Sequence, residues 1–407
     1  MPYRTDPPIS EPITCSHRQI EESAALQMPI TARWTGAASA RHGRSAYEAS
    51  PSVTRTLSNG VRAGCQTKNA ARDRAGVLPA RRPRVSILQG AAVGRHGAAE
   101  GARMRITVMG AGGVGGYYGG MLARAGNEVT FVARGAHLEA LRARGLELRT
   151  QGETHRVAVR AVADPGEAGP MDLALFTVKT YDTATALDAL APAIAGDAAV
   201  LTLQNGVESV DQLTARLGAS RVLAGVTYVA AGIAEPGIVA ENGFSRKIAF
   251  GEPGGGSSSR VEAIFAVMKA AGLDVELSTN ARQAIWDKFV LVAPHATISA
   301  LCQTPIGITR ETPEAMALYH SMVGEVAAVG RAAGFTIPQD EPDRIVANFM
   351  GAPPGQTSSL QRDYANKRRV ELEYLPGSVV RLAKQHGVAV PRFEALYAVL
   401  KVQARQF

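Results

Sequence analysis

A glycine-rich segment that begins at Gly110 has the residue types and spacing needed to bind the phosphates of a dinucleotide. The segment follows the pattern G-x-G-x-x-G, directly after a β-prone run (residues 105–109) and at the start of an expected helix. The first glycine permits a tight turn, Gly112 lets the backbone approach a pyrophosphate, and Gly115 lets strand and helix pack closely. Free N–H groups at the helix start would face the phosphates. The alternative is an ordinary glycine-rich turn. The expected cofactor contacts are Gly110, Gly112, Gly113, Val114 and Gly115.

The end of the next expected strand, residues 128–133, is the position that distinguishes NAD from NADP in such folds. An NAD site usually has Asp or Glu there to bind the ribose 2′-hydroxyl, whereas this chain has Arg134. A guanidinium offers a fork of donors that matches phosphate oxygens. Arg134 therefore favours NADP, the alternative being a solvated surface arginine.

Two further polar residues follow buried strands of the expected sheet. Lys179 comes after the apolar run 172–178, and Asn205 comes just after the apolar run 199–203. In open α/β sheets the C-terminal ends of the strands line the ligand crevice, so we expect both side chains to face the site. Turn or surface roles are the alternatives.

The hydrophobic pattern predicts how the elements that position these residues are organised. Continuous apolar runs are typical of buried parallel strands, and residues 221–252 are also rich in β-prone runs. From about Asn280 the pattern becomes helical, and Trp286, Phe289, Val290 and Ala293 share one helix face. Further helices are expected at 184–191, 313–333, 340–348 and 378–386.

This pattern predicts a Rossmann-like domain over residues 104–278 and an all-helical domain over residues 279–407. The active site is expected in the cleft between the two domains.

The formal net charge of +8 is confined to the first quarter of the chain. Residues 1–103 contain 15 of the 44 basic and 7 of the 36 acidic residues, so the remaining 304 residues contain 29 of each. Prolines interrupt this segment and its apolar runs are short, so we expect it to be disordered. Three accounts remain open: a translation start that truly lies at Met104, a real disordered extension, or a targeting or binding arm. The charge therefore does not indicate a nucleic-acid partner.

Cysteine usage and hydropathy exclude several classes of protein. The chain has three cysteines, and no CxxC spacing indicates a metal site or a disulfide framework. No apolar run approaches the roughly 18 residues of a membrane span, and no secretory segment is recognisable near residue 1. We expect a cytoplasmic protein with no metal, membrane or nucleic-acid partner.

Several segments together resemble the ketopantoate reductase family, and the resemblance spans residues 104–405. It implies a two-domain fold like that of 6-phosphogluconate dehydrogenase, with a Rossmann-like α/β domain followed by an all-α domain. It also implies NADPH-dependent reduction of 2-dehydropantoate to (R)-pantoate, in the route to pantothenate and coenzyme A, by a monomer or a homodimer. The segments that carry the resemblance are residues 104–116, Lys179, 204–206, 286–288, 358–363, 371–377 and 383–391.

The resemblance assigns catalytic roles to Lys288 and Glu371. Lys288 is the general acid that protonates the nascent alkoxide as hydride arrives, because an ammonium stabilises developing negative charge and carries a transferable proton. Glu371 binds the substrate hydroxyl, contacts the cofactor and helps to orient Lys288. The alternatives are a surface lysine on an amphipathic helix and a solvated charge beside Arg368 and Arg369.

The resemblance also assigns binding roles. Ser359 contacts the substrate carboxylate with Asp363 as a supporting group, although Ser359 could instead cap a helix. Asn205 touches both cofactor and substrate, and Lys179 contacts the cofactor.

The helix that carries Lys288 departs from the family pattern. The family usually has Asn four and eight residues after the lysine, where this chain has Val292 and Ala296. Neither side chain can hydrogen-bond to cofactor or substrate from the Lys288 face. Pro294 would remove a helix hydrogen bond, and His295 could supply a polar partner or simply pack in the core.

Three functions remain open from the sequence. The first is reduction of 2-dehydropantoate. The second is a related NADP-dependent reductase that acts on a different 2-oxo acid. The third is a non-catalytic NADP-binding regulatory protein, which would not need to retain Lys288, Glu371 and Ser359.

Overall fold

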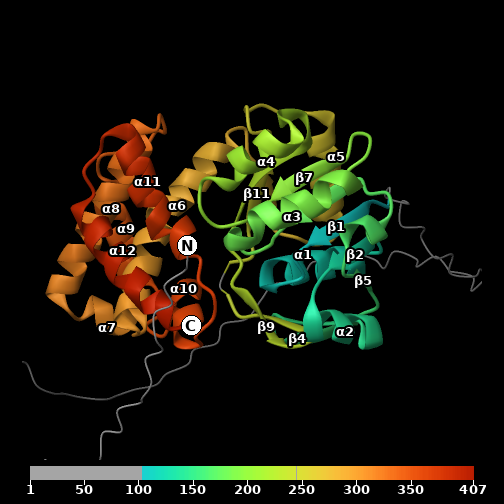
Figure 1. Cartoon of the computed structure of the whole chain (residues 1–407), viewed down its shortest axis with the longest axis horizontal. Helices are drawn as coiled ribbons and strands as arrows, with labels where there is room; N and C mark the ends of the chain where they lie inside the picture. The colour runs from blue at the N-terminus through green and yellow to red at the C-terminus, as the bar shows by residue number, and fades with distance from the viewer. Residues whose placement is uncertain (1–102, 244) are drawn as a thin grey trace, which may run out of the picture. The chain divides into compact units, whose positions relative to one another are not determined.

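The computed structural model describes residues 103–243 and 245–407 (Figure 1). These residues all belong to one compact unit. The expectations about residues 1–102, including a disordered extension and a targeting or binding arm, lie outside the described residues.

An eight-stranded sheet forms the core of the first part of the described chain. Its strand order is β12-β11-β8-β7-β6-β1-β2-β5, and every neighbouring pair is parallel except β8 with β11. This arrangement confirms the predicted Rossmann-like fold. The strands are β1 (Arg105–Met109), β2 (Glu128–Val132), β5 (Arg160–Val162), β6 (Leu173–Phe176), β7 (Ala199–Thr202), β8 (Val222–Thr227), β11 (Ile248–Gly251) and β12 (Val275–Leu277).

The register of the central strands brings their ends to one edge. Met109, the last residue of β1, lies opposite Val132 of β2 and Phe176 of β6, and Phe176 in turn lies opposite Thr202 of β7. The residues that follow these four strands therefore converge, as expected for the ligand-binding edge of an α/β sheet.

A second, four-stranded sheet was not expected from the sequence. Its order is β4-β3-β10-β9, and helix α1 (Gly113–Arg124) packs between it and the large sheet. A Cβ at Gly116 would lie 2.6 Å from Val239 of the small sheet, and one at Gly119 would lie 2.7 Å from Phe131 of the large sheet. The glycines of α1 thus allow close packing on both faces. The strands are β3 (Leu146–Thr150), β4 (Glu153–Val157), β9 (Ala231–Glu235) and β10 (Ile238–Glu241).

Helices make up the remainder of the described chain, and those after residue 280 form the predicted all-α part. The sheet's last strand ends at Leu277 and α6 begins at Ala281. The helices predicted at 184–191, 313–333, 340–348 and 378–386 correspond to α3 (Thr183–Leu190), α8 (Pro313–Ala332), α9 (Glu341–Gly351) and α11 (Pro376–His386). The others are α2 (Gly135–Arg144), α4 (Ser209–Leu217), α5 (Ser259–Ala270), α6 (Ala281–Cys302), α7 (Ile306–Arg310), α10 (Ser359–Ala365) and α12 (Pro391–Gln403).

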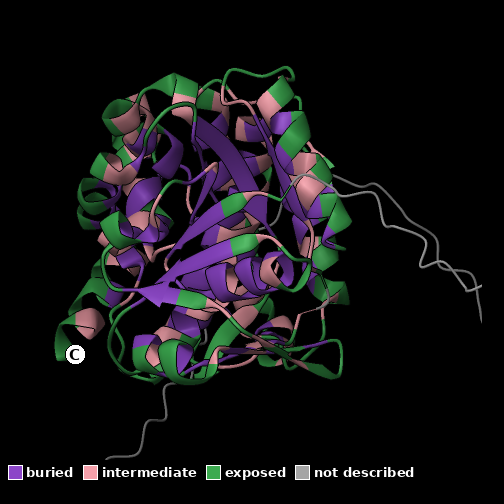
Figure 2. Ribbon diagram, turned by 90° about the vertical axis from the view of Figure 1, so that its right-hand side faces the viewer, coloured by how far each residue is buried: buried purple, intermediate pink, exposed green. Residues whose placement is uncertain are grey.

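Helix α6 joins the sheet to the helical part. It packs against β8 of the sheet and against α8, α10, α11 and α12. Trp286, Phe289, Val290 and Ala293 are buried together, as the helical pattern predicted, and Trp286 stacks on Phe335 at 5.0 Å between ring centroids. The helix continues through Pro294 to Cys302. Figure 2 shows that the strands of the large sheet are mostly buried, whereas many exposed residues lie on the outer helices and loops.

Candidate active site

The turn between β1 and α1 fits closely against the protein on one side and is open on the other. A Cβ at Gly113 would lie only 2.1 Å from the Ala231 carbonyl oxygen, whereas one at Gly112 would meet nothing within 4 Å. Gly110 adopts a φ of 103°, a conformation that suits glycine. No side chain caps the N-terminus of the twelve-residue helix α1. The turn thus leaves space and free N–H groups where a dinucleotide pyrophosphate would bind, so the residues fit the expected cofactor.

Arg134 follows β2 directly and forms the N-cap residue of α2. Its guanidinium is largely exposed and lies 3.8 Å from a carboxylate oxygen of Asp182. Because β2 neighbours β1, the Arg134 side chain belongs to the same sheet edge as the glycine-rich turn. The sequence pattern predicts that a residue at this position binds a ribose 2′-phosphate.

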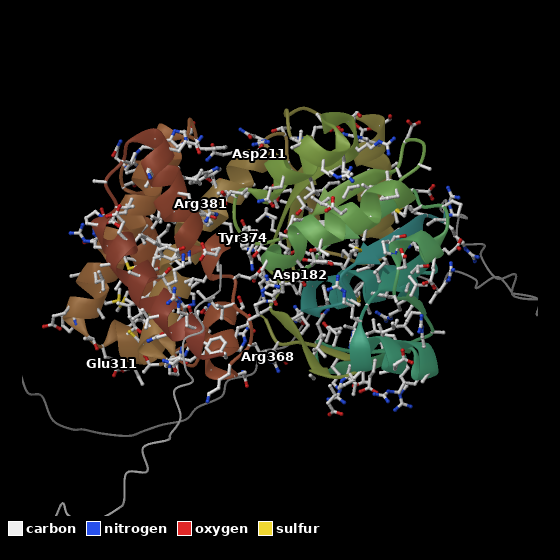
Figure 3. All side chains as sticks on the ribbon, in the orientation of Figure 1. Asp182, Asp211, Glu311, Arg368, Tyr374 and Arg381 are labelled. Carbon is white, nitrogen blue, oxygen red and sulfur yellow. The ribbon has the colours of Figure 1, made fainter. Side chains whose placement is uncertain are left out.

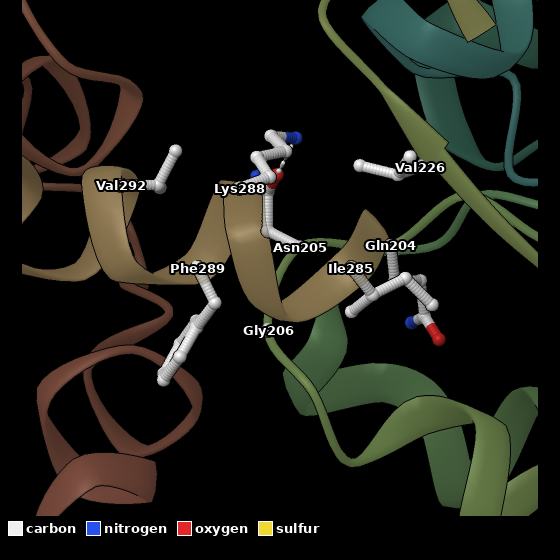
Figure 4. Close-up of a pocket in the computed structure, with 8 residues that line it drawn as sticks. All are labelled: Gln204, Asn205, Gly206, Val226, Ile285, Lys288, Phe289 and Val292. Atoms are coloured by element: carbon white, nitrogen blue, oxygen red, sulfur yellow. Dashed lines mark hydrogen bonds between the residues drawn. The ribbon is translucent and has the colours of Figure 1, made fainter. Parts of the chain in front are cut away.

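Lys288 lies on α6 and points its ammonium at the ends of two strands. Its Nζ donates one hydrogen bond to Asn205 Oδ1 at 2.9 Å (Figure 4). It donates another to the Thr227 carbonyl oxygen at 2.6 Å. The loop that carries Asn205 is held from the helical side, since a Cβ at Gly206 would lie 2.8 Å from the Tyr374 carbonyl oxygen. The structure therefore brings together Lys288 and Asn205, two of the predicted site residues.

Burial lowers the pKa of the Lys288 ammonium to about 8, and the more distant charge of Glu371 partly opposes this shift. Both hydrogen-bond acceptors of Lys288 are neutral, so neither supplies a compensating negative charge. A lysine with a pKa near 8 holds a proton at neutral pH and releases it readily, which suits a general acid.

Glu371 forms hydrogen bonds with Lys179 and Thr180. Its carboxylate accepts hydrogen bonds from Lys179 Nζ at 3.1 Å and from the Thr180 backbone N–H and hydroxyl, each at 2.9 Å. Lys179 Nζ also donates to Asp363 at 2.9 Å. Within residues 103–243 and 245–407, no hydrogen bond joins Glu371 to Lys288. The structure thus groups Glu371 and Asp363 around Lys179, three residues beyond the end of β6.

The two adjacent serines before α10 have separate positions. Ser358 is the N-cap residue, and its hydroxyl accepts a hydrogen bond from the Gln361 N–H at 3.0 Å and pairs with the Ser299 hydroxyl at 2.6 Å. Ser359 is the first residue of the helix and is partly buried. The capping role that the sequence left open for Ser359 therefore belongs to Ser358.

A pocket beside Lys288 is mostly apolar on its α6 side. Val292 contributes to its wall, one helical turn beyond Lys288, and Ala296 is buried farther along the helix. The residues that line the pocket are Gln204, Asn205, Gly206, Val226, Ile285, Lys288, Phe289 and Val292 (Figure 4).

His295 does not serve as a polar partner for Lys288. Neither of its ring nitrogens has a hydrogen-bond partner in the described part of the chain, and the ring packs edge-on against Phe349 at 5.6 Å. Burial lowers the pKa of His295 to about 4, so the ring is neutral at physiological pH. It is a core residue, the second of the two roles that the sequence left open.

Several residues near the site were not identified from the sequence. Thr227 supplies a carbonyl oxygen to Lys288, Thr180 holds Glu371, and Asp182 and Arg369 form an ion pair at 3.1 Å. Thr180 directly follows the predicted residue Lys179 and Asp182 comes two residues later, so their position after the strand was a usable signal. The contribution of Thr227 comes from its backbone, which no side-chain pattern indicates.

Two features are absent from the described residues. None of the helices there is long and apolar enough to cross a membrane. No group of three or more His, Cys, Asp or Glu residues in these ranges could hold a metal ion.

Family models and relatives match nearly all of the described chain. The model of ketopantoate reductase PanE/ApbA matches residues 106–255, and the model of its C-terminal domain matches residues 280–404. A 2-dehydropantoate 2-reductase of Mesorhizobium japonicum is 31% identical and covers 73% of this chain and 97% of its own length. An uncharacterised oxidoreductase of Bacillus subtilis is 27% identical, over 74% of this chain and 98% of its own length.

Solved structures show the same fold. A ketopantoate reductase family protein of Ralstonia eutropha has a TM-score of 0.70 and 38% identity, over 74% of this chain and 99% of its own. D-mandelate dehydrogenase with NADH and anilino(oxo)acetate has a TM-score of 0.69 at 22% identity, over 74% of this chain and 99% of its own, which indicates a shared fold. The sequence matches and the two-part fold agree, and the chain belongs to the ketopantoate reductase family of NAD(P)-dependent oxidoreductases.

Proposed function

We propose that this protein reduces 2-dehydropantoate to (R)-pantoate with NADPH, and that Lys288 donates the proton. The observation that carries the proposal is the lysine itself. Its ammonium has a pKa of about 8 and is held by two neutral oxygens at the edge of the sheet where the cofactor is expected. The 31% identity to a 2-dehydropantoate 2-reductase supports this choice of substrate.

The geometry of Lys288 leaves one donor available for a substrate. An ammonium has three N–H groups, and two of them are directed to Asn205 and to the Thr227 carbonyl oxygen. The third can donate to the carbonyl oxygen of a 2-oxo acid and transfer its proton as negative charge develops there. The bound nicotinamide would supply the hydride to the carbonyl carbon. Lys288 then recovers a proton from solvent for the next turnover.

The remaining site residues would bind and orient the substrate and cofactor. Asn205 is fixed by its contact with Lys288, so its amide nitrogen is available to either ligand. Ser359 would donate to the substrate carboxylate, with Asp363 as support. Glu371 would accept a hydrogen bond from the substrate hydroxyl and would also contact the cofactor. To do so it would give up one of its present hydrogen bonds, from Lys179 or from Thr180.

Arg134 supports NADPH as the cofactor. Replacing it by Ala should weaken NADPH binding far more than NADH binding, because only NADPH carries the 2′-phosphate that the guanidinium would bind. Quenching of protein fluorescence during titration measures both affinities. Equal losses for the two cofactors would defeat the 2′-phosphate role.

A second candidate function is reduction of a different 2-oxo acid. Val292 and Ala296 occupy the positions where the family usually has Asn, and Val292 lines the pocket beside Lys288. An apolar wall offers no hydrogen bond to a hydroxyl of the substrate and favours an apolar side chain there.

Oxidation of NADPH by the purified protein distinguishes these functions. The substrates are 2-dehydropantoate and a panel of 2-oxo acids with aliphatic and aromatic side chains, compared by kcat/KM. Preference for 2-dehydropantoate supports the first proposal, and preference for another acid supports the second. Tight NADPH binding without turnover of any acid would contradict both and favour a regulatory role.

A further inference from the structure

The Asp182 carboxylate lies between two arginines from distant parts of the sequence. Arg134, at the end of β2, approaches one carboxylate oxygen at 3.8 Å, and Arg369, in the segment after α10, approaches the other at 3.1 Å. The proposed mechanism uses neither Asp182 nor Arg369. One carboxylate thus brings a guanidinium of the helical part close to the guanidinium expected to bind the ribose 2′-phosphate.

Arg369 is held in this position by Tyr181 as well. Its guanidinium carbon lies 4.2 Å from the centre of the Tyr181 ring, and its Nη2 donates to the Tyr181 carbonyl oxygen at 3.3 Å. A guanidinium that stacks on an aromatic ring keeps its edge N–H groups free for an anion. Its Nη1 uses one of these N–H groups to bind Asp182 at 3.1 Å.

The charges of this cluster favour an anion with more charge than a carboxylate. Two guanidinium groups face one carboxylate, so Arg134, Asp182 and Arg369 together carry a formal charge of +1. A ribose 2′-phosphate has a charge near −2 and three acceptor oxygens, enough to accept hydrogen bonds from both arginines. The ribose 2′ position of a dinucleotide is also expected at the end of β2, beside Arg134.

We propose that Arg369 is a second residue that binds the 2′-phosphate of NADPH, and that Asp182 holds the two guanidinium groups in place until the phosphate replaces it between them. This inference rests on the proposed preference for NADPH. NADH has no 2′-phosphate, so it leaves the ion pairs of Asp182 intact and gains nothing from Arg369. NADPH binding would also link the helical part to the end of β2.

Binding titrations with the full-length chain test this proposal without reference to turnover. The affinities for NADPH and NADH are measured by fluorescence for the wild type, Arg369→Ala, Arg369→Lys, Asp182→Asn and Arg368→Ala. Arg368 is a matched control, because it precedes Arg369 in the same segment and no ion pair is found for it among the described residues (Figure 3). Thermal melting of each variant shows whether it is folded.

The proposal predicts a specific pattern of affinities. Arg369→Ala should lose about tenfold or more in NADPH affinity, as expected for a lost charge-assisted contact, and change NADH affinity by less than about twofold. Arg369→Lys should lose less NADPH affinity than Arg369→Ala, because lysine keeps the positive charge but lacks the paired N–H donors of a guanidinium. Arg368→Ala should change neither affinity, and Asp182→Asn should tighten NADPH binding because the competing carboxylate is gone.

Two results would overturn the proposal, and they can be told apart. In the first case the wild type prefers NADPH, but Arg369→Ala changes the affinities for NADPH and NADH equally or changes neither. The proposed role of Arg369 is then wrong, and the proposed function stands. If the wild type binds NADH at least as tightly as NADPH, the proposed cofactor preference fails and the role of Arg369 fails with it. Weaker NADH binding by Asp182→Asn would then identify Asp182 as an acceptor for the ribose hydroxyl.

Discussion

Lys288 and Lys179 show how two lysines in one site acquire different properties from their neighbours. Desolvation acts on both. Around Lys288 it prevails and lowers the pKa to about 8, because the hydrogen-bond partners are neutral oxygens. Around Lys179 the charges of Glu371 and Asp363 outweigh it and raise the pKa. Lys288 is thus suited to transfer a proton, whereas Lys179 remains a fixed positive charge.

The pH dependence of the reaction should follow the titration of Lys288. The reduction needs the protonated ammonium, so kcat/KM for the 2-oxo acid should be nearly constant below pH 8. It should fall about tenfold per pH unit above that value as the proton is lost. Initial rates between pH 6 and 10 at saturating NADPH measure this profile. A profile that stays flat to pH 10 would show that Lys288 is not the acid.

The lowered pKa also predicts an effect on stability. Between the folded pKa of about 8 and the ordinary lysine pKa of 10.5, the unfolded chain binds more protons than the folded protein, so this lysine costs stability at neutral pH. Lys288→Met should therefore raise the melting temperature at pH 7, while turnover is lost. The gain should shrink as the pH rises towards 10.5. Thermal melts at several pH values provide the check, and a variant that is less stable at pH 7 would contradict the argument.

At the residue scale, local motifs and the family resemblance were the main basis for predicting the site residues. Lys288 and Asn205 were predicted and do lie together. The contacts of Glu371 with Thr180 and the pairing of Asp182 with Arg369 join residues that are far apart in the sequence. No local pattern encodes such pairs, because they depend on how the helical part packs on the sheet.

Two adjacent glycines of the glycine-rich turn, Gly112 and Gly113, have different roles. A Cβ at Gly113 would collide with the backbone of β9, whereas a Cβ at Gly112 would point into open space. Gly113→Ala should therefore lower the melting temperature by several degrees, because backbone atoms must shift to relieve the overlap. Calorimetry of the protein without cofactor measures the change, and an unaltered melting temperature would contradict the packing argument.

Gly112→Ala provides the matched comparison. It should leave the melting temperature nearly unchanged but weaken dinucleotide binding, because the added methyl group occupies the space that the pyrophosphate needs. Titration with NADPH and NADH should show similar losses for both cofactors, since they share the pyrophosphate. Unchanged binding would mean that the pyrophosphate does not approach Gly112.

At the element scale, the Rossmann-like sheet and the major helices were predictable, but the small sheet was missed. The hairpin of β3 and β4 did carry a signal, because buried Leu146 and Leu148 alternate with polar residues before a Gln151–Gly152 turn. The parallel pairing of β3 with β10 had no such signal. It joins Leu148 to Val239 and depends on how both strands pack over α1.

Ion pairs connect the helical part to the sheet at several places. Arg381 of α11 binds Glu208 at 2.6 Å, and Arg282 of α6 binds Asp211 of α4 (Figure 3). Lys179 contacts Asp363 and Glu371 in the same way. These contacts set the position of Lys288 relative to the strand ends, so the site depends on the association of both parts.

All of the proposed site residues lie in residues 104–407. A chain without residues 1–103 should therefore keep the properties of the site. The family models match within residues 106–404, and the described contacts of the site also fall in that range. A chain that starts at Met104 should keep the NADPH affinity and melting temperature of the full chain. It should also have a net charge near zero, because the excess of eight basic residues lies in residues 1–103. NADPH titrations and thermal melts of the two chains, carried out in parallel, make the comparison. Loss of NADPH binding by the shortened chain would assign a role to the first 103 residues.

Single-turnover oxidation of NADPH tests the central claim, that Lys288 supplies the proton for reduction of a 2-oxo acid. The wild type and Lys288→Ala are each mixed with NADPH and the preferred 2-oxo acid, and the decay of NADPH absorbance is followed. The account predicts a rate about 10²–10⁴-fold lower for Lys288→Ala, with NADPH affinity preserved. An equal rate in the two proteins would contradict it.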